Sequence, residues 1–86
     1  MRHATDDDLQ RVAAFLARLR AEPELRERTP GSFSRGSRAF LHFHADREDI
    51  YVDVRLGGVF ERVKVTTVEE QEELLARARR SLESQD

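Results

Sequence analysis

The sequence predicts an α+β fold: a two-layer α-β-β-β-α sandwich in which two helices cover one face of a three-stranded antiparallel sheet of order 1-2-3. Three consecutive stretches between residues 38 and 66 alternate apolar with polar side chains, the pattern of strands with one buried face. Apolar residues recur at helical spacing on both sides of this region. The chain has 86 residues, enough for one modest core, so we expect residues 1–86 to form a single domain.

The first helix is expected over residues 6–21. Thr5 and the aspartates that follow it favour a helix start, because such side chains accept hydrogen bonds from free backbone N–H groups and place negative charge at the helix N-terminus. Apolar residues then recur every three or four positions. Pro23 either ends this helix or begins a further short turn, and residues 24–28 are expected to be helical and exposed.

Residues 29–36 have the composition of a linker. Pro30-Gly31 is a turn signal, and Phe33 is the one large apolar side chain that could pin the segment to the core. Its glycines, serines and arginine could present backbone N–H groups to an anion. The spacing of a phosphate-binding loop is absent, however, so the segment is interpreted as a connecting loop.

Strands are expected over residues 38–45, 50–56 and 59–66. Gly57-Gly58 predicts a two-residue hairpin, because a type I′ turn needs positive φ at both central positions. Residues 46–49 then form a four-residue loop, since a five-residue loop would mix apolar and polar residues on one face.

These two turn lengths fix which side chains share each face of the sheet, because directly opposed residues point the same way. The inner face, which the helices should cover, holds Leu41, Phe43, Ile50, Val52, Val54, Leu56, Val63 and Val65. The outer face holds three rows across the strands, namely Phe40-Arg55-Phe60, His42-Asp53-Arg62 and His44-Tyr51-Lys64. Glu61 falls on the inner side and must therefore lie at the sheet edge, where it reaches water or an arginine.

The second helix is expected over residues 68–82. Thr67 and Glu70 have the spacing of a capping box, in which each side chain accepts a hydrogen bond from the backbone N–H of the other residue. Glutamates dominate the first turns and arginines the last, as the helix dipole favours.

The composition limits the classes of function. There is no cysteine, which excludes disulfides and thiolate chemistry, and no apolar run approaches the ~20 residues of a membrane span. No signal-peptide core is present, so we expect a reducing, cytoplasmic location. The net charge of −2 argues against a strong polyanion binder, although a local basic patch remains compatible with it.

The outer face is the expected functional surface. Aromatic side chains grouped among basic ones on an uncovered sheet face are typical of contact surfaces. The sequence therefore predicts a small interaction module that forms a homodimer or binds another protein, with no cofactor and no catalytic residue. The predicted interface consists of Phe40, His42, His44, Tyr51, Asp53, Arg55, Phe60, Arg62 and Lys64.

Two alternatives stay open. His42, Asp53 and Arg62 could form a small-ligand or catalytic site, because Asp53 could fix one imidazole tautomer. The rings and cations could instead bind single-stranded nucleic acid. His42 and His44 could also ligate a metal with Asp53, but Arg62 opposes a cation there, so histidines in an ion-pair network are favoured and no metal is expected.

Overall fold

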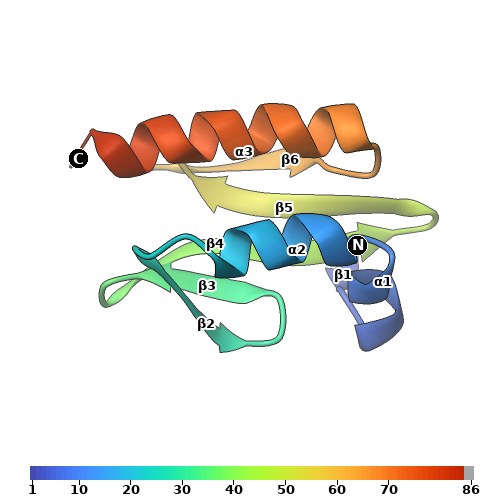
Figure 1. The fold of residues 1–86 in the computed structure, drawn as a ribbon. Coiled ribbons are helices and arrows are strands. Elements are labelled where there is room, and N and C mark those ends of the chain that lie inside the picture. The colour runs from blue at the N-terminus through green and yellow to red at the C-terminus, as the bar shows by residue number, and fades with distance from the viewer. Residues whose placement is uncertain (85–86) are drawn as a thin grey trace.

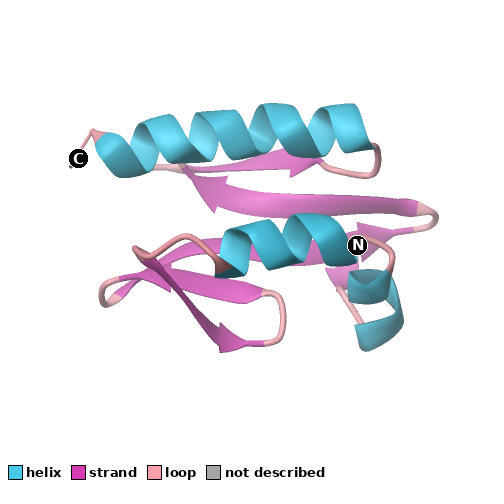
Figure 2. Ribbon diagram, viewed as in Figure 1, coloured by secondary structure: helices cyan, strands magenta, loops and turns pink. Residues whose placement is uncertain are grey.

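The computed structural model describes residues 1–84 and confirms the α+β class with an antiparallel sheet. The sheet has six strands, more than the predicted three, in the order β2-β3-β4-β5-β6, with β1 paired to β4 (Figures 1 and 2). The elements are β1 (Arg2–His3), α1 (Asp6–Gln10), α2 (Ala13–Arg20), β2 (Leu25–Thr29), β3 (Ser32–Arg35), β4 (Arg38–Asp46), β5 (Asp49–Arg55), β6 (Phe60–Lys64) and α3 (Val68–Glu83).

The region predicted as one helix over residues 6–21 forms two helices. Thr5 caps α1 in a capping box with Asp8, as the acidic start suggested. The chain leaves helical geometry at Val12, where φ is −120° and ψ is 32°, and α2 begins at Ala13. The helical region therefore begins and ends close to the predicted bounds, but it consists of two helices and not one.

Residues 24–36 differ most from the prediction. In place of an exposed helical segment and a linker, the chain forms the hairpin β2-β3, in which Glu27 pairs with Phe33. Pro30-Gly31 is the turn of this hairpin, and Gly31 has a φ of 77°, which a side chain would disfavour. Pairing of β3 with β4 stabilises strands whose own sequence has little apolar alternation.

The meander β4-β5-β6 has the predicted register, although both turns differ from the prediction. Asp46 pairs with Asp49, so the first turn is shorter than the expected loop over residues 46–49. Gly58 has a positive φ but Gly57 does not, so the second turn is not the expected type I′. His42 pairs with Asp53, and Asp53 pairs with Arg62 on its other side. His44 lies opposite Tyr51 in the same way. The central rows of the outer face are therefore present as expected.

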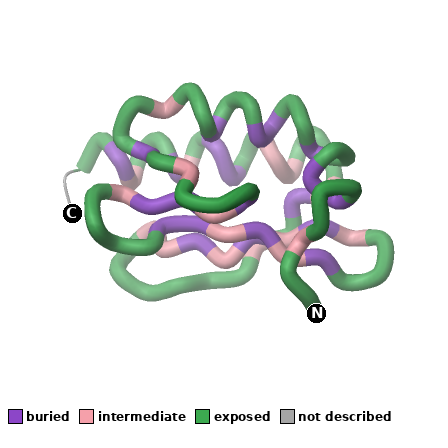
Figure 3. Tube along the Cα trace, turned by 90° about the horizontal axis from the view of Figure 1, so that it is seen from below, coloured by how far each residue is buried: buried purple, intermediate pink, exposed green. Residues whose placement is uncertain are grey.

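The helices cover one face of this sheet, which we call the inner face. α2 and α3 lie over the same side of the strands in Figure 1, and the buried positions of the strands alternate with more exposed ones in Figure 3. The core combines residues of the helices, of the β2-β3 hairpin and of the meander. It consists of Leu9, Val12, Phe15, Leu16, Leu19, Leu25, Phe33, Phe40, Leu41, Phe43, Ala45, Ile50, Val52, Val54, Val65, Leu74, Leu75, Ala78 and Leu82.

Phe40 is the one predicted outer-face residue that belongs to this core, with only 2% of its surface exposed. The register between β3 and β4 shifts at this point, since Phe33 pairs with Leu41 and Ser34 with Ala39. Phe40 is the unpaired residue of this β-bulge, and a bulge breaks the alternation of side chains between faces. Phe40 and Leu41 are consequently both buried, and the predicted row Phe40-Arg55-Phe60 is wrong in its first member.

The C-terminal helix follows the prediction closely. Thr67 and Glu70 form the capping box at the start of α3. Glu61, the polar residue on the inner side of the edge strand, accepts a hydrogen bond from Arg77 of α3 at 2.8 Å. Within residues 1–84, no helix is both long and apolar enough to cross a membrane.

Candidate functional site

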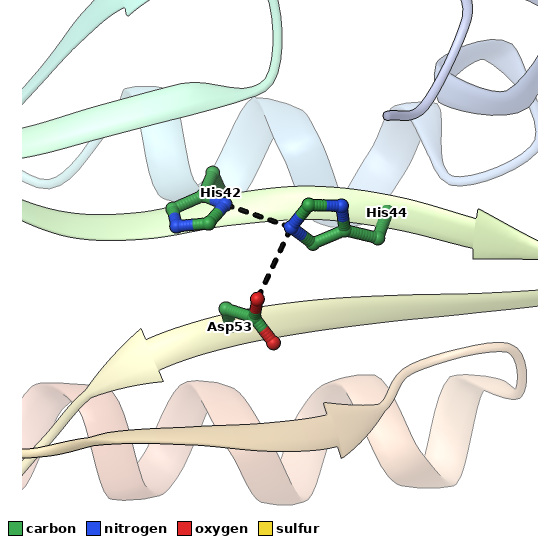
Figure 4. A group of neighbouring side chains, drawn as sticks. All are labelled: His42, His44 and Asp53. Atoms are coloured by element: carbon green, nitrogen blue, oxygen red, sulfur yellow. Dashed lines mark hydrogen bonds and ion pairs between the residues drawn. The ribbon is translucent and has the colours of Figure 1, made fainter. Parts of the chain in front are cut away.

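The outer face of the sheet carries the candidate site. Apart from Phe40, every residue predicted for the interface lies on a strand of this face: His42 and His44 on β4, Tyr51, Asp53 and Arg55 on β5, and Phe60, Arg62 and Lys64 on β6. Figure 4 views this side of the sheet, with the helices behind the strands. α2 and α3 lie over the opposite face of the sheet, so neither helix covers these side chains (Figure 1).

Two histidines and an aspartate meet at the centre of this face (Figure 4). Nδ1 of His42 lies 2.9 Å from Nε2 of His44, and the same Nε2 lies 3.1 Å from Oδ2 of Asp53. These two polar contacts of the His44 ring thus use a single nitrogen atom. We call these three residues the histidine cluster.

The strands hold the cluster firmly in place. His42 and His44 are two positions apart on β4 and so project from the same face, while Asp53 lies directly opposite His42 on β5. Their chain neighbours Phe43 and Val52 are buried in the core on the other face. Core packing on one side therefore fixes the backbone from which the cluster projects.

Arg62 joins the cluster through Asp53. Its Nε and Nη2 atoms donate to the two carboxylate oxygens at 2.8 and 2.9 Å, a bidentate pair. These hydrogen bonds, with the charge of Arg62, hold the pKa of Asp53 below its usual range. Asp53 is therefore ionised at neutral pH.

His42 is shifted toward its neutral form. Burial lowers the pKa of His42, and the nearby His44 lowers it further, against the opposing attraction of Asp53. A neutral imidazole keeps a lone pair on one ring nitrogen, so His42 can accept a hydrogen bond or ligate a cation at neutral pH.

His3 is a member of this site that the sequence reasoning missed. It comes from β1, which pairs with β4 so that His3 lies opposite His44. The two rings stack with centroids 5.1 Å apart and planes 29° apart. A two-residue strand has too few positions to show a periodic pattern, so no local signal points to it.

A hollow of about 430 Å³ adjoins the cluster. It lies between β1 and β3, which pair with different parts of the same edge of β4. The hollow is lined by His3, Ala4, Thr29, Pro30, Gly31, Ser32, His42 and Phe43.

The hairpin β2-β3 extends the outer face with arginines that the sequence reasoning also missed. Arg26 pairs with Ser34, and Arg28 donates from Nε to the Ser34 hydroxyl at 2.9 Å. Had residues 24–28 been recognised as a strand, their alternation would have placed Arg26 on one face and Leu25 on the other.

Comparisons with models of protein families, with curated proteins and with solved structures find no match to this chain. The geometry of the outer face is therefore the basis for the functional proposal.

Proposed function

We propose that the chain is a small binding module whose outer sheet face binds single-stranded nucleic acid. The observation that supports this most directly is the charge of that face, which is basic although the whole chain carries a net charge of −2. Aromatic rings on which bases can stack lie among the arginine and lysine side chains of this face.

The carboxylates are distributed unevenly between the two sides of the molecule. The outer face carries the side chains of Arg26, Arg28, Arg55, Arg62 and Lys64, against Asp53 at its centre and Asp46 and Asp49 at the β4-β5 turn. Lys64 also lies 3.5 Å from Glu70 of α3. Glutamates are concentrated instead on α3, which lies over the inner face. A phosphate backbone approaching the outer face would meet a positive local potential, and such local fields steer association even when the net charge has the opposite sign.

Two rings on this face are placed to stack on bases. Phe60 is 45% exposed, and the guanidinium of Arg55 lies over its ring, 5.5 Å from the centroid. Tyr51 lies beside Lys64 on the neighbouring strand. Aromatic side chains with adjacent cations on a sheet are the usual platform for unpaired bases, since every base has a π-face and every nucleotide a phosphate.

A homodimer remains a second candidate, through a different surface from the one the sequence suggests. Face-to-face packing would place the arginines of one outer face against those of its copy, and like charges repel. Phe40 is buried, so its ring cannot contribute to such an interface. The edge strand β6 is more suitable, since one of its sides has no strand partner within the described chain. Beside it, Val59 is 75% exposed.

Fluorescence anisotropy with a labelled oligothymidylate tests the main proposal. We expect binding with a Kd in the range of about 10⁻⁶–10⁻⁴ M at moderate salt, weakening steeply as salt rises. Phe60→Ala should weaken binding by removing a stacking surface, worth ~1–3 kcal/mol per base. Arg26→Ala should make the plot of log K against log salt concentration less steep, with the slope reduced by about 1 because one phosphate contact is lost.

Arg80→Ala is the matched control, because Arg80 is an exposed arginine on α3, away from the outer face. It should leave binding unchanged. An absence of binding at low salt, or an equal loss in Arg80→Ala and Arg26→Ala, would contradict the proposal. Sedimentation of the same samples tests the homodimer. If the chain dimerises through β6, the unmodified protein should have the mass of a dimer and Val59→Asp the mass of a monomer.

A further inference from the structure

We propose that Nδ1 of His42, Nε2 of His44 and a carboxylate oxygen of Asp53 together bind one divalent transition-metal ion, of which zinc fits the ligand set best. This inference is independent of nucleic-acid binding. It follows from how hydrogen atoms can be distributed within the histidine cluster.

The cluster has too few hydrogen atoms for its contacts when both histidines are neutral. Nε2 of His44 faces a ring nitrogen of His42 at 2.9 Å and a carboxylate oxygen of Asp53 at 3.1 Å. If Nε2 carries a hydrogen, that single hydrogen must serve both neighbours. If it carries none, its lone pair faces the lone pairs of the carboxylate, and two acceptors repel each other at this distance.

A cation placed among the three atoms satisfies all of them at once. Each of the three residues offers a ligand atom, and these atoms all lie within 4.8 Å of one another. Ligands of a tetrahedral zinc ion at ~2.0–2.2 Å are themselves about 3.3–3.5 Å apart. The two contacts made by His44 therefore need to open by only a few tenths of an ångström. The ligand atoms of His42 and Asp53, which lie within 4.8 Å of each other, need to reach the same spacing through side-chain torsions.

Arg62 is compatible with such a site. A carboxylate has two lone pairs on each oxygen, and Arg62 donates one hydrogen bond to each oxygen of Asp53. Each oxygen thus keeps a lone pair for a metal. Carboxylates that ligate a metal usually accept hydrogen bonds from outer-shell groups, a role that Arg62 can fill. The Arg62 side chain is 48% exposed, so water screens the repulsion between the two cations.

The ligand types select the class of ion. Two imidazole nitrogens with one carboxylate oxygen favour first-row transition metals such as Zn²⁺, Fe²⁺, Ni²⁺ or Cu²⁺, whereas Mg²⁺ and Ca²⁺ prefer all-oxygen sites. A fourth position would be available to water or to a small ligand, and a hollow of about 430 Å³, lined in part by His42, adjoins the cluster. His3 stacks on His44 but lies outside the set of convergent ligand atoms, so we assign it no metal bond.

The test uses untagged protein treated with chelator and then titrated with Co²⁺ and Zn²⁺. We expect Co²⁺ to give visible d–d absorption bands that saturate at one ion per chain and disappear when Zn²⁺ displaces it. Zn²⁺ should raise the melting temperature, whereas Mg²⁺ at the same concentration should not. No bands at millimolar Co²⁺, or an equal effect of Mg²⁺, would overturn the proposal.

Two substitutions of the same kind separate ligands from neighbours. His44→Gln should weaken Zn²⁺ binding at least tenfold, while His3→Gln should change it less than threefold. His42→Gln provides a second ligand variant, and metal-free melting curves check that each variant is folded. An equal loss in His3→Gln and His44→Gln, or retention of Co²⁺ bands in both ligand variants, would overturn the assignment.

Discussion

Phe40 shows how one unpaired residue changes the function of a surface. By strict alternation it would lie beside Arg55 and Phe60 as an exposed ring, and the bulge instead places it in the core. The outer face thereby loses one of its expected aromatic anchors. What remains there is more basic and less apolar than the sequence suggests, which favours an anionic partner over a second copy of the same face.

We predict that Phe40→Ala and Phe43→Ala destabilise the chain to a similar extent. Both rings are 2% exposed, and truncating a buried aromatic side chain costs ~3–5 kcal/mol. Phe60→Ala should cost less than about 1 kcal/mol, because its ring is largely outside the core. Urea denaturation measures all three, and Phe40→Leu provides a milder variant if the alanine form does not fold. A Phe40→Ala loss as small as that of Phe60→Ala would contradict the burial of Phe40.

At the scale of elements, the start of α1 is tied to β1 through one carboxylate. Asp8 accepts hydrogen bonds from Thr5 in the capping box and from the guanidinium of Arg2. The hydrogen bond from Arg2, followed by that from the Thr5 backbone, holds the pKa of Asp8 well below its usual range. Two short elements are therefore joined at a single ionised group.

Asp8→Asn tests this link, because asparagine is a good helix cap but carries no charge. A lowered pKa stabilises the folded chain at pH values above the ordinary aspartate pKa of ~3.9, and this contribution is lost as the pH falls toward the folded-state value. We expect Asp8→Asn to be less stable by about 1 kcal/mol at pH 7, and the difference should shrink below about pH 4. Urea melts at several pH values measure it. A difference that does not vary with pH would show that the charge of Asp8 is unimportant.

Sequence reasoning succeeded where the determinants are local. Gly57-Gly58 and the short loop after Ala45 fixed the register of the meander, and the capping box at Thr67 located α3. It failed for β1, β2 and β3, which are short and polar and depend on pairing with distant segments. The central row of the outer face was therefore predictable, whereas His3 and the arginines of β2 were not.

At the scale of the whole molecule, the uneven distribution of carboxylates should be visible in chromatography. The chain has a calculated pI of about 5.9, and a uniformly charged protein of that pI would not bind heparin at pH 7.5. We predict that this chain is retained, because the polyanion would contact only the basic outer face. Arg55→Ala should elute at lower salt than the unmodified protein, and Arg80→Ala should elute close to it. Flow-through of the unmodified protein at low salt would contradict a basic outer face.

The way in which β1 and β3 share β4 has a consequence for the order of folding. The β4-β5 and β5-β6 hairpins join residues close in the chain, whereas β1 pairs Arg2 with Ala45 and must close a long loop through only two residue pairs. We therefore expect β1 to dock last and to open first. The amide of Ala4, which donates to the Phe43 carbonyl at 3.3 Å, should then exchange with solvent deuterium sooner than amides inside the meander. Each such opening would expose the His44 ring that His3 otherwise covers, so access to the centre of the outer face would depend on the least stable strand of the sheet.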